Sequence, residues 1–197
     1  KEARLGSVFP RKAFEAESPS QEMTTVRRFR CEDLLRMNDT NLDVLTETYN
    51  QSFYLSYFAT WPQYYMMAES PNGTIMGYIM GKAEGKEDLW HGHVTAVTVT
   101  PEYRRLGLAR KLMQCLEDTT EKPYNGYFVD LFVRVSNALA ISMYEKLGYQ
   151  VYRRVLGYYS GTEPEDAFDM RKALSRDPEK LSMVPLPEPI YPHELEW

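Results

Sequence analysis

The sequence predicts a single α/β domain with a mixed central sheet, and three observations support this. An apolar, β-branched run at Val94–Val99 leads through a short basic loop into Leu108–Leu116, where apolar residues recur at helical spacing. A second strand-and-helix unit follows at residues 126–148. Upstream of both units, two apolar runs flank Pro71–Thr74, whose Pro-Asn-Gly-Thr sequence is typical of a hairpin turn.

Composition narrows the class of protein. At 197 residues, one domain buries about seventy per cent of its unfolded surface. The net charge of −5 argues against a general nucleic-acid binder. Cys31 and Cys115 form neither a disulfide framework nor a zinc pattern, which indicates a reducing, cytoplasmic setting. No apolar run approaches the roughly 20 residues that cross a bilayer, so we expect no membrane span.

The first part of the chain combines an extension, two helical stretches and a hairpin. Residues 1–22 mix basic residues with glutamates ahead of Met23, which reads like a natural start, so we expect a disordered extension there. The domain itself is predicted over residues 23–174. Its opening elements are a strand at Val26–Phe29, helices near Cys31–Met37 and around Leu45–Phe58, and hairpin strands at Tyr64–Glu69 and Ile75–Ala83.

Alternation and capping residues define the later elements. Period-two spacing predicts a strand with Val129, Leu131, Val133 and Val135 on one face and Phe128, Asp130, Phe132 and Arg134 on the other. Ser136-Asn137 supplies a helix cap, and Gly148 ends that helix. Strands are then expected at Tyr149–Tyr159 and Ala167–Lys172. Prolines are frequent in residues 175–197, which we expect to form a tail.

The basic loop Arg104–Ala109 is the most informative motif. It opens a helix, and a helix N-terminus offers unpaired N–H groups and a partial positive charge that can hold a phosphate. Gly107 permits close backbone approach, while Arg104 and Arg105 add charge. A solvated turn with two surface arginines is the alternative. The sequence therefore predicts a loop that holds a pyrophosphate.

The spacing Arg-x-x-Gly-x-Ala in this loop resembles the acetyl-CoA loop of the GCN5-related N-acetyltransferases (GNAT), and Ser136–Tyr149 is similar to the second half of the same core. The resemblance implies helices on both faces of the sheet, and fourth and fifth strands (His93–Thr100 and Tyr127–Val135) that splay apart to admit the pantetheine arm. It implies that acetyl-CoA is the cosubstrate. The residues expected to bind it are Val97, Val99, Arg104, Arg105, Gly107, Leu108, Ala109, Asn137 and Tyr144.

Longer blocks resemble the catalytic subunits of the N-terminal acetyltransferase NatB over residues 23–192. They are Leu42–Tyr49, Met76–Gly85, Trp90–Ala96, Val129–Asn137 and Asp169–Asp177. This resemblance implies acetyl transfer to the α-amine of an initiator Met followed by Asp, Glu, Asn or Gln. It also implies action on nascent polypeptide N-termini at the ribosome. Two alternatives are an enzyme of the same fold that acetylates lysines or small amines, and a catalytically idle CoA-binding scaffold.

A large helical-repeat auxiliary subunit is the partner that the NatB resemblance implies. The first helical region carries Leu34, Leu35, Met37, Leu42 and Leu45, more apolar surface than one helix usually buries in its own core. We therefore expect the auxiliary subunit to grip this region and the proline-rich tail.

Tyr144 is a candidate catalytic residue, because family members place a tyrosine near the CoA sulfur at this position. Its hydroxyl can hydrogen-bond or protonate the departing thiolate; a core aromatic is the alternative. An α-amine with a pKa near 7.8 is about one-fifth neutral near pH 7.2. A weak base or a water relay therefore suffices to activate it.

His91, His93, Thr95 and Val97 are expected to share one face of the fourth strand by period-two spacing. No third ligand accompanies the two histidines, so no metal site is predicted. His93 and Thr95 are instead predicted to contact the second side chain of the peptide, because imidazole and hydroxyl can serve a carboxylate or a carboxamide. His93 is also a candidate base, directly or through water; bonding to the backbone is the alternative for both residues.

The resemblance implies that two segments of the chain close over the incoming peptide. Glu47 and Tyr49 lie in the loop after the first helix, and Tyr158 and Tyr159 end the sixth strand. The tyrosine hydroxyls can bind the peptide backbone, and the Glu47 carboxylate can attract the N-terminal ammonium. Several related N-terminal acetyltransferases carry His where Phe132 stands, so the base that they use is absent here.

Overall fold

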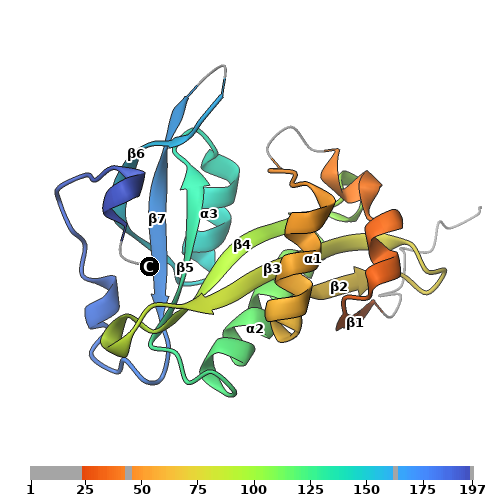
Figure 1. Ribbon diagram of the computed structural model, residues 1–197, viewed down its shortest axis with the longest axis horizontal. Coiled ribbons are helices and arrows are strands. Elements are labelled where there is room, and N and C mark those ends of the chain that lie inside the picture. The colour runs from red at the N-terminus through yellow and green to blue at the C-terminus, as the bar shows by residue number, and fades with distance from the viewer. Residues whose placement is uncertain (1–23, 43–45, 162–163, 196–197) are drawn as a thin grey trace, which may run out of the picture.

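One seven-stranded sheet forms the centre of the computed structural model, which describes residues 24–42, 46–161 and 164–195 (Figure 1). The strand order is β1-β2-β3-β4-β5-β7-β6. Among the described strands, β4 and β5 are parallel and the other neighbours are antiparallel. The strands are β1 Thr25–Arg28, β2 Met66–Glu69, β3 Ile75–Glu84, β4 His91–Val99, β5 Phe128–Arg134, β6 Gln150–Tyr159 and β7 Glu165–Ala173. The predicted mixed α/β sheet is confirmed.

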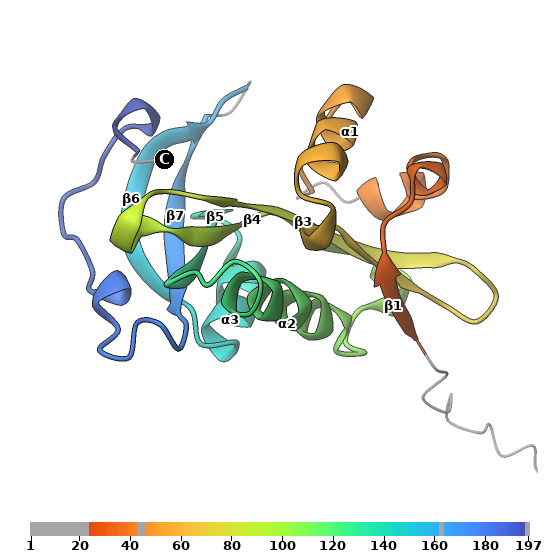
Figure 2. The same ribbon diagram turned by 60° about the horizontal axis from the view of Figure 1, so that its bottom comes forward.

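Helices cover both faces of this sheet (Figure 2). Helix α1, Gln51–Thr60, lies on one face, and α2, Leu108–Glu121, lies on the other with α3, Ala138–Lys146. Tyr54 and Tyr57 of α1 join one buried cluster, while Leu112 and Leu116 of α2 join a second. Short 3-10 helices occur at Cys31–Leu35, Asn38–Asn41, Pro62–Tyr64, Glu87–Leu89, Pro101–Tyr103, Leu181–Met183 and Pro192–Glu194. No helix among the described residues is long and apolar enough to cross a membrane.

The first helical region differs from the prediction. Where a helix near Cys31–Met37 is expected, only Cys31–Leu35 form a short 3-10 helix, and the expected helix from Leu45 begins only at Gln51. The Asn50 side chain accepts a 2.9 Å hydrogen bond from the backbone N–H of Phe53, which caps the helix at that point. The helix therefore starts at its cap, whereas the apolar pattern suggested an earlier beginning.

The expected apolar surface of this region is only partly exposed. Met37 is buried in the molecule's own core, so its inclusion in a partner surface is wrong. Leu34 is half-buried, whereas Leu35 and Leu42 are 77% and 78% exposed. Leu45 falls in 43–45, which lie outside the described residues, as does the predicted extension at 1–22.

The splay between β4 and β5 is confirmed by their pairing. The two strands pair at three positions only, from Gly92 opposite Val129 to Val94 opposite Leu131. Beyond that point β4 continues to Val99 and β5 to Arg134 without pairing to each other. Because strand backbones carry obligatory hydrogen-bonding groups, the divergence leaves polar backbone edges facing the space between the strands.

A β-bulge in β4 changes which side chains share a face. Met80 of β3 lies opposite Ala96, and the next residue, Gly81, lies opposite Val94, so Thr95 is an extra residue. Thr95 donates a 3.1 Å hydrogen bond to the Tyr57 hydroxyl on the α1 side. Val97 packs instead into the core on the opposite face. The expectation that Val97 shares the face of His91 and His93 is therefore wrong, because the bulge breaks the alternation.

The C-terminal segment runs along β6. The Leu186 N–H donates to the carbonyl of Tyr152 at 2.7 Å, and the Ile190 N–H donates to the carbonyl of Arg154 at 3.1 Å. In return, the Ile190 carbonyl accepts from the Leu156 N–H at 2.8 Å. The boundary between a domain at 23–174 and a tail at 175–197 stays a prediction.

Candidate active site

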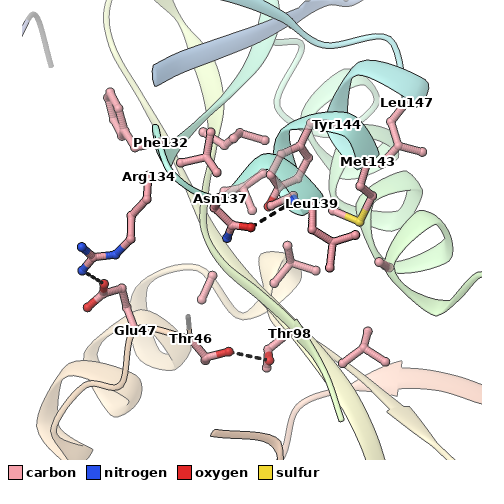
Figure 3. Close-up of a pocket in the computed structure, with 18 of the residues that line it drawn as sticks. Thr46, Glu47, Thr98, Phe132, Arg134, Asn137, Leu139, Met143, Tyr144 and Leu147 are labelled. Carbon is pink, nitrogen blue, oxygen red and sulfur yellow. Dashed lines mark hydrogen bonds and ion pairs between the residues drawn. The ribbon is translucent and has the colours of Figure 1, made fainter. Parts of the chain in front are cut away.

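A groove of about 780 Å³ opens where β4 and β5 part (Figure 3). Its walls come from β4, β5, the start of α2, one side of α3, the end of β6 and the segment around Glu47. Every site residue that the sequence predicts lines it: Glu47, Tyr49, His93, Thr95, Val97, Val99, Arg104, Arg105, Gly107, Leu108, Ala109, Asn137, Tyr144, Tyr158 and Tyr159. Predicted site residues from five separate parts of the chain thus meet in one cavity.

The loop before α2 has the geometry of an anion cradle. Gly107 is the N-cap of α2 and adopts a left-handed conformation with φ 79°, and Arg105 has φ 66°. A Cβ added at Gly107 would meet no heavy atom within 4 Å, so this side of the loop is open. The Arg104 Nε donates a 3.1 Å hydrogen bond to the Val99 carbonyl, which ties the loop to the end of β4. The N–H groups of the first turn of α2 point outward from such a helix start.

Helix α3 supplies the wall beside Tyr144. The Asn137 side chain accepts a 3.1 Å hydrogen bond from the Ala140 N–H, which confirms the predicted cap (Figure 3). Tyr144 is 8% exposed and lines the groove. Burial raises the pKa of the Tyr144 hydroxyl well above its ordinary value. The hydroxyl therefore stays protonated at physiological pH and can donate a proton or a hydrogen bond, but does not serve as a base.

An ionic group joins two sides of the groove mouth. The Arg134 guanidinium lies 2.6 Å from the Glu47 carboxylate and 3.3 Å from that of Glu165 (Figure 3 shows the first pair). The same guanidinium sits 4.0 Å above the ring of Tyr159. Sequence reasoning did not assign Arg134 to the site. The alternation of side chains along β5 could have indicated this role, because it places Arg134 on the same face as Phe132.

Aromatic side chains form a further part of the groove wall. Tyr49 stacks on Phe53 with ring centroids 4.3 Å apart, and Tyr158 stacks on Phe132 at 4.6 Å. Burial, with the nearby Glu47, raises the pKa of Tyr49 to about 12. Burial also raises the pKa values of Tyr158 and Tyr159. These hydroxyls are therefore neutral hydrogen-bonding groups on a largely apolar wall.

His93 is held by a buried carboxylate that sequence reasoning missed. The His93 Nδ1 lies 2.8 Å from Asp130 Oδ1 on the neighbouring strand, and both residues are buried. Burial alone would raise the pKa of Asp130, but the imidazoles of His91 and His93 hold it well below its ordinary value. The sequence signal for this partner was the single carboxylate of β5, which lies on the face shared with Phe132.

Metal ligation has no support in the part of the chain that the structure describes. No group of three or more His, Cys, Asp or Glu side chains is arranged there to hold an ion. His91 and His93 instead direct their ring nitrogens at Asp130.

Comparison with known proteins identifies the family. The sequence pattern of the acetyltransferase (GNAT) family matches residues 32–149. The chain is 65% identical over 175 residues to the N-terminal acetyltransferase B complex catalytic subunit NAA20 of Arabidopsis thaliana, covering 89% of this chain and 99% of that protein.

Two solved structures agree with this assignment. The crystal structure of Chaetomium thermophilum Naa20 with a bisubstrate analogue superposes with a TM-score of 0.79 at 44% identity, covering 86% of this chain and 97% of that one. The NatB acetyltransferase complex bound to CoA and MES gives 0.70 at 50% identity, covering 77% and 99%. The predicted fold and the predicted acetyl-CoA cosubstrate are both confirmed at the level of the family. The chain belongs to the acetyltransferase (GNAT) family and, within it, to the catalytic subunits of the N-terminal acetyltransferase NatB.

Proposed function

We propose that the chain transfers the acetyl group of acetyl-CoA to the α-amine of protein N-termini that begin with Met followed by Asp, Glu, Asn or Gln. The observation that carries this proposal is the single groove in which an anion cradle, a buried protonated tyrosine and a polar pair on β4 lie together. The similarity to NatB catalytic subunits supports the same substrates.

The donor half of the groove suits acetyl-CoA. The open Gly107 loop and the first turn of α2 would hold the pyrophosphate, with Arg104 and Arg105 adding positive charge. The polar backbone edge of β4 between Thr95 and Val99 would pair with the amides of the pantetheine arm. Acetyl-CoA supplies the acetyl group as a thioester, whose carbonyl carbon accepts the amine.

The acceptor half suits a neutral α-amine. The lone pair of the neutral amine forms the new C–N bond, and the nitrogen gives up a proton to His93 or to a water molecule as that bond forms. As the C–S bond breaks, the Tyr144 hydroxyl stabilises the leaving sulfur by donating a hydrogen bond or its proton. Glu47, held by Arg134 at the groove mouth, is placed to attract the ammonium form.

Recognition of the first two residues divides between two surfaces. The aromatic wall of Tyr49, Tyr158 and Phe132 would receive the initiator Met. His93 and Thr95 would meet the second side chain, since each can pair with a carboxylate or a carboxamide. An apolar second residue would leave a buried polar group unpaired, at a cost of roughly 1–3 kcal/mol.

The partner is proposed to be a large helical-repeat auxiliary subunit that covers the exposed Leu35 and Leu42, together with the tail. A solved neighbour is itself a NatB complex, which supports such an assembly. We place this assembly in the cytoplasm, acting on nascent N-termini at the ribosome without sequence-specific nucleic-acid contact.

Gly107→Glu is expected to weaken acetyl-CoA binding at least tenfold, about 1.4 kcal/mol, because a carboxylate would enter the anion cradle. Calorimetric titration with acetyl-CoA measures this. Gly73→Glu is the matched control, since Gly73 has a similar φ of 84° but does not line the groove. Equal acetyl-CoA affinity in the two folded variants would show that the loop at Gly107 does not bind the pyrophosphate.

Tyr144→Phe is expected to lower kcat by ~10²–10⁴-fold while leaving acetyl-CoA affinity unchanged, because only the leaving thiolate needs the hydroxyl. Steady-state kinetics on a Met-Asp peptide measures both quantities. The control is Tyr149→Phe, whose hydroxyl donates to buried Glu117 instead of the groove. If the two variants turn over alike, Tyr144 has only a packing role.

A peptide panel tests the substrate class. Met-Asp and Met-Glu peptides are expected to exceed Met-Leu, Ser-Glu and internal-lysine peptides at least about tenfold in kcat/KM. His93→Ala should lose most of the rate on Met-Asp but little acetyl-CoA affinity. Equal acetylation of Met-Leu and Met-Asp by the unmodified enzyme would contradict the proposed specificity.

A double substitution tests the partner surface. Leu35→Glu with Leu42→Glu is expected to reduce co-purification of the auxiliary subunit at least tenfold, since charge replaces apolar contacts. Leu89→Glu, at an exposed leucine outside this region, is the control. Undiminished co-purification of the double variant would remove this surface from the interface.

A further inference from the structure

His91 lies beside the groove yet has no role in the proposed reaction. It is 4% exposed and stacks on Phe128, with ring centroids 4.5 Å apart. Its Nδ1 lies 2.5 Å from the carbonyl oxygen of Leu89. Its Nε2 lies 3.5 Å from Asp130 Oδ2 and 3.9 Å from Glu84 Oε1, without a hydrogen-bond partner among the described residues.

These distances determine the charge of His91. A carbonyl oxygen only accepts, so Nδ1 must carry a proton. A neutral imidazole would then present the lone pair of Nε2 to the carboxylates of Asp130 and Glu84, which is repulsive. The arrangement is attractive only when both nitrogens are protonated. Burial alone would lower the pKa of His91, but Asp130 and Glu84 raise it above its ordinary value, in agreement with this geometry.

The other oxygen of Asp130 determines the tautomer of His93. An ionised carboxylate accepts only, so the 2.8 Å contact with His93 Nδ1 requires a proton on that nitrogen. In a neutral His93 the second ring nitrogen, Nε2, is then a hydrogen-bond acceptor. One carboxylate thus faces both imidazoles, with Oδ1 toward His93 and Oδ2 toward His91.

Charged groups from the neighbouring strands surround this pair. The Lys82 ammonium lies 2.5 Å from the Glu84 carboxylate, and Arg171 lies opposite Asp130 in the register of β5 and β7. On β7, Asp169 is bonded to Arg153 and Arg171. The titratable and charged groups facing the pair are Lys82 and Glu84 from β3, His91 from β4, Asp169 and Arg171 from β7, Arg153 and Tyr158 from β6, and Tyr149 between α3 and β6.

We propose that His91 and Asp130 are positioning residues for His93: the buried His91 imidazolium stabilises the ionised Asp130 carboxylate, and Asp130 fixes His93 as the tautomer that presents Nε2 as an acceptor. This inference rests on the proposed contact between His93 and the second side chain of the peptide. An acceptor at that place pairs directly with the amide N–H of Asn or Gln. A carboxylate of Asp or Glu is bound with uptake of one proton by His93, because the one proton of the Thr95 hydroxyl is donated to Tyr57.

Imidazole ¹⁵N spectra test the assignment without requiring turnover. The chain has three histidines, so labelling this subunit alone within its complex gives signals that single substitutions assign. His91 should show two protonated nitrogens above the ordinary titration range near pH 6.5, and His93 should show the Nδ1–H tautomer. Asp130→Asn should abolish the protonation of both His91 nitrogens and the Nδ1–H tautomer of His93, whereas Asp177→Asn, at a buried carboxylate in the tail, should retain them. A neutral His91 at pH 7 would overturn the proposal.

His91→Gln gives a kinetic test that loss of structure cannot mimic. Without the imidazolium, Asp130 loses the positive charge beside its Oδ2, and His93 should take up a proton, which makes Nε2 a donor. The ratio of kcat/KM for Met-Asp over Met-Asn should then rise about fivefold, because a hydrogen bond to a charged partner is about 1 kcal/mol stronger. An unchanged or lower ratio in a folded variant would overturn the proposal. Failure of both peptides as substrates of the unmodified enzyme would instead refute the proposed function and leave the spectra to test the charge assignment.

Discussion

The parting of β4 from β5 is the constraint on which the rest of the site depends. Parallel strands normally continue to pair, yet here pairing stops after Val94 and Leu131. Each strand still runs on, so the gap has two rigid walls rather than loops. Side chains on rigid strands are held more tightly than side chains on loops. The bulge at Thr95 lies one residue beyond the last pair and turns the β4 side chains at that point.

Ion pairs between segments that are distant in sequence also hold this groove together. Glu47, on a segment far from β5 in sequence, reaches Arg134, and Arg134 also binds Glu165 at the start of β7. Removing one member of such a group leaves its partners uncompensated, so the members depend on one another. The deeper group around Asp130 follows the same rule with imidazoles in place of guanidinium. Both groups lie along the face of β5 whose side chains alternate with the apolar core.

The sequence predicted the helices and strands better than it predicted where they begin, which face a side chain takes, or which residues pair between segments. The strand–loop–helix unit ending in α2 and the alternation of β5 were readable because apolar periodicity and glycine placement act locally. The late start of α1 was not readable, because the Asn50 cap outweighed an apolar pattern that extended further upstream. The face of Val97 was mispredicted because one inserted residue in β4 reverses every later position. Asp130 and Arg134 escaped assignment because their partners lie on other strands and segments.

The segment along β6 also bears on how the molecule avoids self-association. β6 is the outermost strand at its end of the sheet, and an uncovered outer strand offers free N–H and C=O groups to another chain. Residues 186–190 occupy several of these groups on Tyr152, Arg154 and Leu156. At the opposite border, β1 spans only four residues, too short to template extensive pairing. Both borders of the sheet therefore resist pairing with another chain: residues 186–190 cover β6, and β1 is too short.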